Sequence, residues 1–397
     1  MNKSTPYWMW IQQAVGQGSS AVPKLLEAFS SPEEVYAADR LELQRAGISG
    51  KALDCLCRKS LDAMQRMAER CEKIGWILTP DDRGYPDPLR QLYSPPLVLY
   101  GKGLLPNLST PSMPPIGMVG TRKSTAYGDR VAGGIAAGLS AVGCIVISGG
   151  AMGIDRASHE GALYGGGFTV AVQACGLDIE YPVPNRHLRQ RIVEDGGAVI
   201  TEYLPGTQAF PNHFQVRNRL ISGLSWGVCI VEAPERSGAL ITARHAREQG
   251  RDVFVVPGNI TSAESYGSNE LIKDGATLIT RPSEILREYQ VRCGGALQED
   301  EADRAQTAYH EYLRRGQEPI RRTLRVADGT KPVAPTPCPD GVSDTAKAVY
   351  AVLTDAPITA EELCSISGIP ASKLFAGLTE LEIHGCARSY PGKRYSK

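Results

Sequence analysis

The sequence predicts an α/β protein built on an extended Rossmann-like, doubly wound parallel sheet, with a small helical N-terminal domain and a winged-helix C-terminal domain. Three observations lead to this prediction. From about residue 116 to 288, short apolar runs alternate with helical stretches, as in a parallel sheet covered by helices on both faces. Residues 1–75 show only helical patterns. Residues 343–397 show three short helices and a hairpin-like end, the order found in winged helices.

The composition restricts the possible function classes. A chain of 397 residues with 42% apolar residues is expected to form two or three soluble domains. Its formal net charge is zero, so no global basic field points to nucleic acid, and any such site must be a local patch. The sequence contains no apolar run of about 18 residues and no signal-peptide pattern, so we expect a cytoplasmic protein without membrane contact.

The cysteines indicate neither disulfides nor a metal site. The chain has ten of them, without a CxxC pair, and Cys144, Cys175 and Cys229 lie in apolar runs where cysteine acts as a small hydrophobic residue. We therefore expect a reducing compartment and no metal or other cofactor.

Residues 1–75 are expected to form a small helical domain of the SAM or helix-hairpin-helix kind. The sequence Ser31-Pro32-Glu33-Glu34 has the serine, proline and acidic residues of a helix start. The turn at 46–49 resembles helix-hairpin-helix turns that hold DNA backbone, but such short turns are common, so we favour a structural role for it.

Residues 76–290 are expected to be the central domain. Two short strands within 76–101 would add to the edge of its sheet. The seven expected strands of the parallel sheet are 116–119, 144–148, 169–172, 198–201, 227–232, 253–256 and 276–279. Ligands of doubly wound sheets bind beyond the carboxyl ends of the strands, so the loops that follow these runs are expected to carry the function.

Residues 291–342 are expected to be a linker, because a charged, partly helical stretch leads into a Pro-rich tail. In the winged helix, residues 343–397, the presumed recognition helix 371–384 has few base-reading side chains, so partner contact or nonspecific binding is favoured over sequence reading. The end of the chain has four basic residues and no acidic one: Arg388, Lys393, Arg394 and Lys397.

The segment 212–225, NHFQVRNRLISGLS, predicts an amphipathic helix with an arginine on its apolar face. Arg217 falls on that face, whereas Asn218 and Arg219 lie on the other side. A buried guanidinium needs a carboxylate or an anionic ligand to offset its desolvation. Two partners remain open: Glu202 in an internal ion pair, or a phosphate near the helix N-terminus.

Two loops at expected strand ends favour the phosphate. The loop VGTRKS offers exposed amides, a hydroxyl and the cations Arg122 and Lys123. The loop that begins Ser148-Gly149-Gly150 contains three glycines, whose N–H groups could form an anion-binding nest. Neither loop has the GxGxxG pattern of dinucleotide sites. Asp155 and His159 could form a catalytic pair, but helix capping and packing explain them better.

Seven motifs occur in unbroken order between about Tyr85 and Thr280: VGTR, SGGAMGIDRASHEGAL, GLDIEYPVPN, FQVRNRLISGLS, SGALITARHA, EQGRDVFVVPGNI and GSNELIKDGA. This series resembles the DNA-processing protein A family, also called DprA or Smf. Two departures from the family pattern are visible. Gln215 and Val216 stand where a proline commonly precedes RNR, and Gln173–Cys175 replace the usual Leu-Gly pair. Neither departure removes a cation.

The resemblance implies a homodimer that binds single-stranded DNA in a basic pocket and helps load RecA recombinase on incoming DNA during natural transformation (competence), without catalysis. Arg122, Arg217 and Arg219 would hold phosphates, and Phe214 would stack on or pack beneath a base. Such binding would be indifferent to sequence, because cations follow the backbone and a ring accepts any base. The predicted nucleic-acid-binding residues are Arg122, Lys123, Ser148, Gly149, Gly150, Phe214, Arg217, Asn218 and Arg219.

Two other function classes remain open. The SGALITA turn resembles the glycine-rich loop of Rossmann-like nucleotide phosphoribohydrolases, although the second part of their PGGxGTxxE pattern is missing. A nucleotide-processing enzyme is therefore the alternative to a DNA-binding mediator. The winged helix alone could also belong to a duplex-binding transcription regulator.

Overall fold

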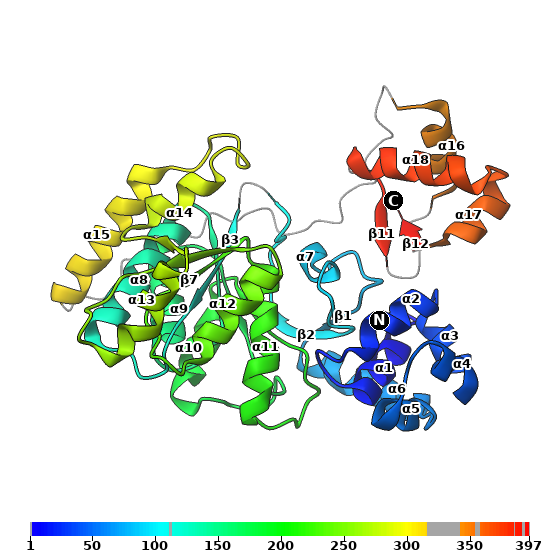
Figure 1. Cartoon of the computed structure of the whole chain (residues 1–397), viewed down its shortest axis with the longest axis horizontal. Coiled ribbons are helices and arrows are strands. Elements are labelled where there is room, and N and C mark those ends of the chain that lie inside the picture. The colour runs from blue at the N-terminus through cyan, green and yellow to red at the C-terminus, as the bar shows by residue number, and fades with distance from the viewer. Residues whose placement is uncertain are drawn as a thin grey trace.

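A nine-stranded sheet forms the centre of the computed structural model (Figure 1), which describes residues 2–110, 113–315, 342–353, 358–384, 386–390 and 394–396. The strand order is β1-β2-β6-β5-β4-β3-β7-β8-β9. The strands are β1 Trp76–Leu78, β2 Leu99–Gly103, β3 Pro115–Val119, β4 Ile145–Ser148, β5 Thr169–Val172, β6 Ala198–Thr201, β7 Gly227–Ile230, β8 Asp252–Val255 and β9 Thr277–Leu278. Strands β3 to β9 pair in parallel, while β1 and β2 add antiparallel at one edge, as predicted.

Helices cover both faces of the sheet, which explains why its central strands are apolar throughout. Alternate residues of each strand enter different cores: Val146 packs with the residues of α8, while Ile145 and Ile147 pack with those of α11. The helices of this domain are α7 Asp87–Arg90, α8 Ala126–Ala141, α9 Ile154–Gly165, α10 Arg186–Glu194, α11 Pro211–Leu224, α12 Gly238–Glu248, α13 Tyr266–Lys273, α14 Pro282–Tyr289 and α15 Glu299–Arg315. The doubly wound fold is therefore confirmed.

The direction of winding reverses between β3 and β7. From β3 the chain passes outward through β4, β5 and β6, and it then returns to add β7 on the other side of β3. The loops that follow these two neighbouring strands diverge beyond the carboxyl edge, where doubly wound sheets bind their ligands. This reversal point is the expected place for a binding site.

Helix α15 occupies part of the segment expected to be a linker. Its Ala302, Ala305 and Tyr309 are buried, and the Ser283 hydroxyl donates to Asp303 at 2.9 Å. His310 Nε2 lies 3.1 Å from the carbonyl oxygen of Arg130 in α8. The charged stretch is therefore an amphipathic helix packed on α8, because its apolar residues recur at helical spacing. The Pro-rich remainder of the expected linker lies outside the described residues.

In the described residues 2–75, six helices precede the sheet, as the helical patterns of residues 1–75 predicted. They are α1 Thr5–Val15, α2 Ala21–Ala28, α3 Pro32–Ala37, α4 Arg40–Arg45, α5 Gly50–Leu56 and α6 Leu61–Ile74. Ser31 caps α3 by accepting a hydrogen bond from the N–H of Glu34 at 3.2 Å, with Pro32 in the first turn. In the turn at 46–49, the carbonyl oxygen of Gly47 accepts a hydrogen bond from Lys24 Nζ at 2.9 Å.

The C-terminal unit is the predicted winged helix: α16 Asp344–Val352, β10 Ile358–Thr359, α17 Ala360–Ser367, α18 Ala371–Ile383, β11 Arg388–Tyr390 and β12 Arg394–Ser396. Figure 1 shows it beside the helical domain. Of its four terminal basic residues, Lys393 and Lys397 lie outside the described residues.

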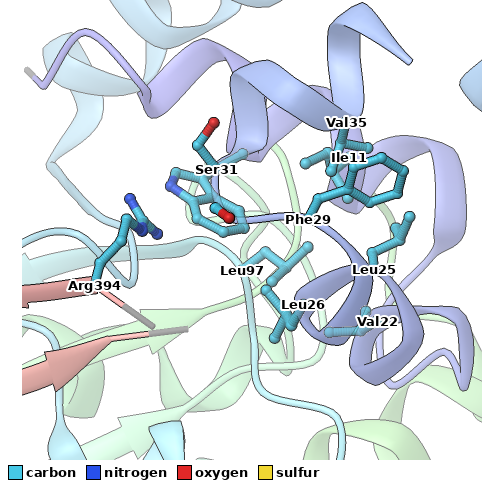
Figure 2. Close-up of a pocket in the computed structure, with 11 residues that line it drawn as sticks. Ile11, Val22, Leu25, Leu26, Phe29, Ser31, Val35, Leu97 and Arg394 are labelled. Carbon is cyan, nitrogen blue, oxygen red and sulfur yellow. The ribbon is translucent and has the colours of Figure 1, made fainter. Parts of the chain in front are cut away.

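A buried carboxylate joins the winged helix to the rest of the molecule. Arg394 Nη2 lies 2.8 Å from Asp81 Oδ1, and both side chains are buried. Asp81 Oδ2 accepts hydrogen bonds from the Ser4 hydroxyl at 2.7 Å and from the Trp8 indole at 2.8 Å. Figure 2 shows Arg394 at the edge of a small apolar pocket of the helical domain.

Candidate nucleic-acid interface

A groove of about 630 Å³ opens at the reversal point of the sheet. Its walls come from the loops after β3 and β7, the first two turns of α11 and the start of α12. Four arginines and two carboxylates line it: Arg122, Arg217, Arg236, Arg244, Asp155 and Glu235. The groove therefore provides a local positive surface on a chain whose net charge is zero.

The loop after β3 is held by backbone and carboxylate contacts. The N–H of Thr121 donates to the carbonyl oxygen of Glu232 at 2.7 Å, and the N–H of Ile154 donates to the carbonyl oxygen of Thr121 at 3.2 Å. The buried Glu232 carboxylate accepts hydrogen bonds from the N–H of Thr125 at 2.9 Å and from its hydroxyl at 2.5 Å. Arg122 therefore projects from a fixed backbone, although its own side chain is exposed.

The start of α11 places a ring under that arginine. Phe214 is the fourth residue of the helix, and the Arg122 guanidinium carbon lies 4.2 Å from the centre of its ring. Within the described part of the chain, Arg122 forms no ion pair. Its closest partner is therefore an aromatic face, a weak partner compared with a phosphate, while its charge also acts on the Asp155 carboxylate across the groove.

Arg217 lines the same groove but is only 3% exposed. Its Nη1 donates to the carbonyl oxygen of Gly149 at 2.7 Å and also to that of Val172. Burial lowers the pKa of Arg217 to about 10, and the nearby Asp155 carboxylate opposes this shift. Arg217 is therefore charged at neutral pH and holds the loop after β4 against α11.

Arg219 lies outside the groove lining. Its Nη2 contacts Glu202 Oε1 at 2.5 Å, and its side chain packs against Gly18 of the helical domain. Burial raises the pKa of Glu202, and the Arg219 charge opposes that shift. The internal ion pair that the sequence left open is thus formed, but by Arg219 rather than by Arg217.

Helix α11 is buried on both sides rather than on one. Asn218 is 8% exposed and Arg219 is 9% exposed, because α12 and the helical domain cover the face opposite the apolar one. The amide of Asn218 is occupied: it donates to the carbonyl oxygen of Gly238 at 3.2 Å and accepts from Arg217 Nε at 3.3 Å.

The three residues Ser148-Gly149-Gly150 serve the fold directly. The Ser148 hydroxyl donates to the carbonyl oxygen of Met118 at 2.7 Å, and the carbonyl oxygen of Gly150 accepts from Asn185 Nδ2 at 3.0 Å. A Cβ on Gly149 would lie 2.5 Å from the Arg217 guanidinium, so the close approach that glycine permits here is to a side chain of the protein itself.

Four predicted binding residues meet in the groove: Arg122, Phe214, Arg217 and Asn218. The other five are not among its lining residues: Lys123, Ser148, Gly149, Gly150 and Arg219. Lys123 is exposed next to Arg122.

Two further cations of the groove were not singled out from the sequence. Arg236 precedes the start of α12 and Arg244 lies within that helix, and both are exposed. In the portion of the chain that the structure describes, neither forms an ion pair. The signal was present, because SGALITA was recognised as a phosphate-type turn, and both arginines lie within a few residues of it.

Asp155 and His159 do not form a catalytic pair. Asp155 Oδ2 accepts a hydrogen bond from the N–H of Ala151 at 3.2 Å, and burial raises its pKa although Arg217 opposes the shift. His159 is fully buried with Nδ1 2.7 Å from the Thr169 hydroxyl oxygen. Burial lowers the pKa of His159 to about 3. Asp155 does not cap α9, whose N-cap residue is Gly153 and has no side-chain cap bond, but it holds the loop before that helix, while His159 packs in the core as favoured from the sequence.

Among the described residues, no group of three or more His, Cys, Asp or Glu side chains could hold a metal ion. No helix in those residues is long and apolar enough to cross a membrane.

Comparisons with known proteins identify the family. Residues 76–290 match the family model of DNA recombination-mediator protein A, and residues 333–393 match that of the DprA winged helix domain. The chain is 32% identical over 400 residues to protein Smf of Synechocystis sp., covering 100% of this chain and 99% of that protein. It is 41% identical over 209 residues to DNA processing protein DprA of Streptococcus pneumoniae, covering 53% and 72% of the two chains.

A solved structure gives the same result. The X-ray structure of DNA processing protein A from Streptococcus pneumoniae superposes with a TM-score of 0.61 at 33% identity, covering 72% of this chain and 99% of that one. The chain therefore belongs to the DNA recombination-mediator protein A family, whose members are also named DprA and Smf.

Proposed function

We propose that this protein binds single-stranded DNA without sequence preference in the groove between the loops after β3 and β7. The observation that carries the proposal is Arg122, exposed on a fixed loop and stacked on Phe214 at the reversal point of the sheet. A cation beside a ring is the combination that single-strand binders use, because the cation holds a phosphate and the ring stacks on a base.

The remaining groove residues support the same ligand. Arg236 and Arg244 add exposed cations for successive phosphates. The side-chain amide of Asn218, which could read a base edge, is already bonded within the protein. Binding should therefore follow the backbone rather than the sequence. A single strand is favoured over a duplex because its unpaired bases can reach an aromatic ring.

We propose that the protein acts by binding and not by catalysis. The groove carboxylate Asp155 accepts a hydrogen bond from the N–H of Ala151 and lies within the electrostatic influence of Arg217, and His159 is buried away from solvent. By membership of a recombination-mediator family, we further propose that the chain forms a homodimer and helps load RecA recombinase on incoming single strands during natural transformation in the cytoplasm.

Two experiments test these proposals. Fluorescence anisotropy with single-stranded oligonucleotides of different sequences, and with the matching duplexes, should show tight binding only to single strands and similar affinities for all of them. Equal affinity for duplexes would instead assign the binding to the winged helix.

RecA loading is measured by the ATPase activity of RecA on single strands coated with single-strand-binding protein. The wild-type chain should shorten the lag, and the Arg122→Ala variant should not. An unchanged lag with the wild-type chain would reject the loading function. Release of free base from nucleoside monophosphates would reject the proposal that the protein is not an enzyme.

A further inference from the structure

An exposed tyrosine stands next to the ring that the proposed function assigns to DNA. Tyr181 lies in the loop between β5 and α10, and its ring centre is 5.5 Å from that of Phe214 at an interplanar angle of 54°. Its side chain is 39% exposed. Phe214 therefore contacts Arg122 and also a second aromatic ring that solvent can reach.

The backbone of Tyr181 is fixed by hydrogen bonds from a neighbouring helix. Arg189 Nη1 in α10 donates to the carbonyl oxygens of Tyr181 and Pro182, both at 3.0 Å. The N–H of Tyr181 donates to the carbonyl oxygen of Ile179 at 3.1 Å. The backbone that carries the ring is thus fixed while the ring stays partly exposed, so little backbone entropy is lost when a ligand packs on the ring.

The fold makes little use of the ring itself. Within the residues that the structure describes, the Tyr181 hydroxyl makes no hydrogen bond, and the ring of Tyr181 contacts that of Phe214. A large apolar ring left partly in water, on a fixed backbone and beside a phosphate-binding cation, has the features of a stacking surface.

We propose that Tyr181 is a second base-stacking platform of the DNA site, which takes an unpaired nucleobase of any identity next to the base on Phe214. This inference rests on the proposed single-strand binding and deepens it. Phosphates would lie on Arg122, while neighbouring bases would lie on the two rings. Tyr181 thus extends the site from the groove toward α10, beyond the residues that line the groove itself.

The test separates base contacts from backbone contacts. Anisotropy titrations of the full-length protein would compare an oligothymidylate with an oligonucleotide of equal length that carries abasic sites. The variants are Tyr181→Ala, which removes the ring, and Tyr181→Phe, which keeps it. Tyr93→Ala is the matched control, because Tyr93 is 76% exposed and lines a groove beside the winged helix, away from Phe214.

Stacking predicts that Tyr181→Ala weakens oligothymidylate binding by about 5-fold or more, the equivalent of one stacked base. Binding of the abasic strand, and the slope of affinity against salt, should stay as in the wild type, because no cation is lost. Tyr181→Phe and Tyr93→Ala should bind like the wild type.

Equal losses for both strands, or no loss for either, would overturn the stacking role of Tyr181. Such results leave single-strand binding itself intact. If the wild-type protein binds neither strand, the proposed function fails instead, so the two failures are distinguishable.

Discussion

The guanidinium of Arg122 lies over the ring of Phe214, with 4.2 Å between the guanidinium carbon and the ring centre. The arginine comes from the loop after β3 and the phenylalanine from the first turns of α11, so only the folded sheet brings them together. Because the arginine stacks on a ring and forms no ion pair with another described residue, a phosphate can bind it without displacing a carboxylate. This contact is the centre of the proposed DNA site.

The Arg219–Glu202 pair is predicted to matter for stability and not for DNA binding. Both side chains are buried, so removal of either one leaves an uncompensated charge that costs about 3 kcal/mol of unfolding free energy. Chemical denaturation of Arg219→Ala and Glu202→Ala should show this loss. The salt dependence of DNA binding should not change.

The double variant Arg219→Ala/Glu202→Ala provides the control, because it removes both charges. Its loss of unfolding free energy should be smaller than the sum of the losses in the two single variants. If Arg219→Ala kept full stability and reduced the salt dependence of DNA binding, Arg219 would instead be a phosphate contact, as the family resemblance implies.

Because His159 is buried in its neutral form, the free energy of unfolding is expected to fall in acid. The Thr169 hydroxyl donates to the carbonyl oxygen of Val146 at 2.8 Å, so His159 Nδ1 must carry the proton that it shares with Thr169, and the buried Nε2 has no partner among the described residues. Protonation at Nε2 would create a buried, unsatisfied cation.

The sign of this effect follows from the pKa of His159, about 3 in the folded chain and 6.5 as the ordinary value. The unfolded chain binds a proton first, so the contribution of His159 is complete above pH 6.5 and is lost as the pH falls toward 3. Thermal midpoints measured over this range should fall less steeply for His159→Asn than for the wild type. Parallel curves for the two proteins would contradict this assignment.

The Asp81–Arg394 contact is predicted to hold the winged helix against the helical domain. In Asp81→Asn the buried guanidinium loses the carboxylate charge of Asp81, so the docked arrangement is weakened and the radius of gyration from small-angle X-ray scattering should rise. Asp54→Asn is the matched control, because the Arg40–Asp54 pair at 2.9 Å is exposed and contributes little. An unchanged radius for Asp81→Asn would show that other contacts position the winged helix.

The strands and their parallel arrangement followed from local patterns, because fully apolar runs flanked by helices have few alternatives to a parallel sheet, whereas the order of the strands came only from the structure. The loop of Arg122 and the ring of Phe214 were predicted from the same patterns together with the family motifs. The strands, the Arg122 loop and the Phe214 ring each depend on a short stretch of sequence. They can therefore be predicted from one sequence without knowing which distant parts of the chain pack together.

The roles of the two RNR arginines could not be predicted in this way. Arg217 and Arg219 are two residues apart, yet one faces the groove and the other faces Glu202 and the helical domain. A helical wheel gives the direction of each side chain but not what covers it. The position of the helical domain, which decides the partner of Arg219, depends on contacts between residues far apart in the chain.

The dependence on contacts between residues far apart in the chain also explains why Tyr181 and Arg244 were not predicted from the sequence as site residues. Tyr181 lies within the motif GLDIEYPVPN and Arg244 within SGALITARHA, but a motif does not show which of its side chains reaches the groove or Phe214. Each residue acquires its place only when a distant loop or helix packs nearby. The structure of helix α15 differs from the predicted linker for another reason. Its many charges suggested a linker, although its few apolar residues suffice for packing on α8.

The most direct test of DNA binding at this groove is an anisotropy titration of a single-stranded oligonucleotide over a series of salt concentrations, with the wild type, Arg122→Ala and Arg66→Ala. Arg66 is an exposed cation of α6 in the helical domain and serves as the control. Loss of one phosphate contact predicts that Arg122→Ala weakens binding to all sequences alike and lowers the salt slope by about one, while Arg66→Ala behaves like the wild type. If Arg122→Ala bound single strands as tightly as the wild type, with the same slope, this groove would not be the DNA site.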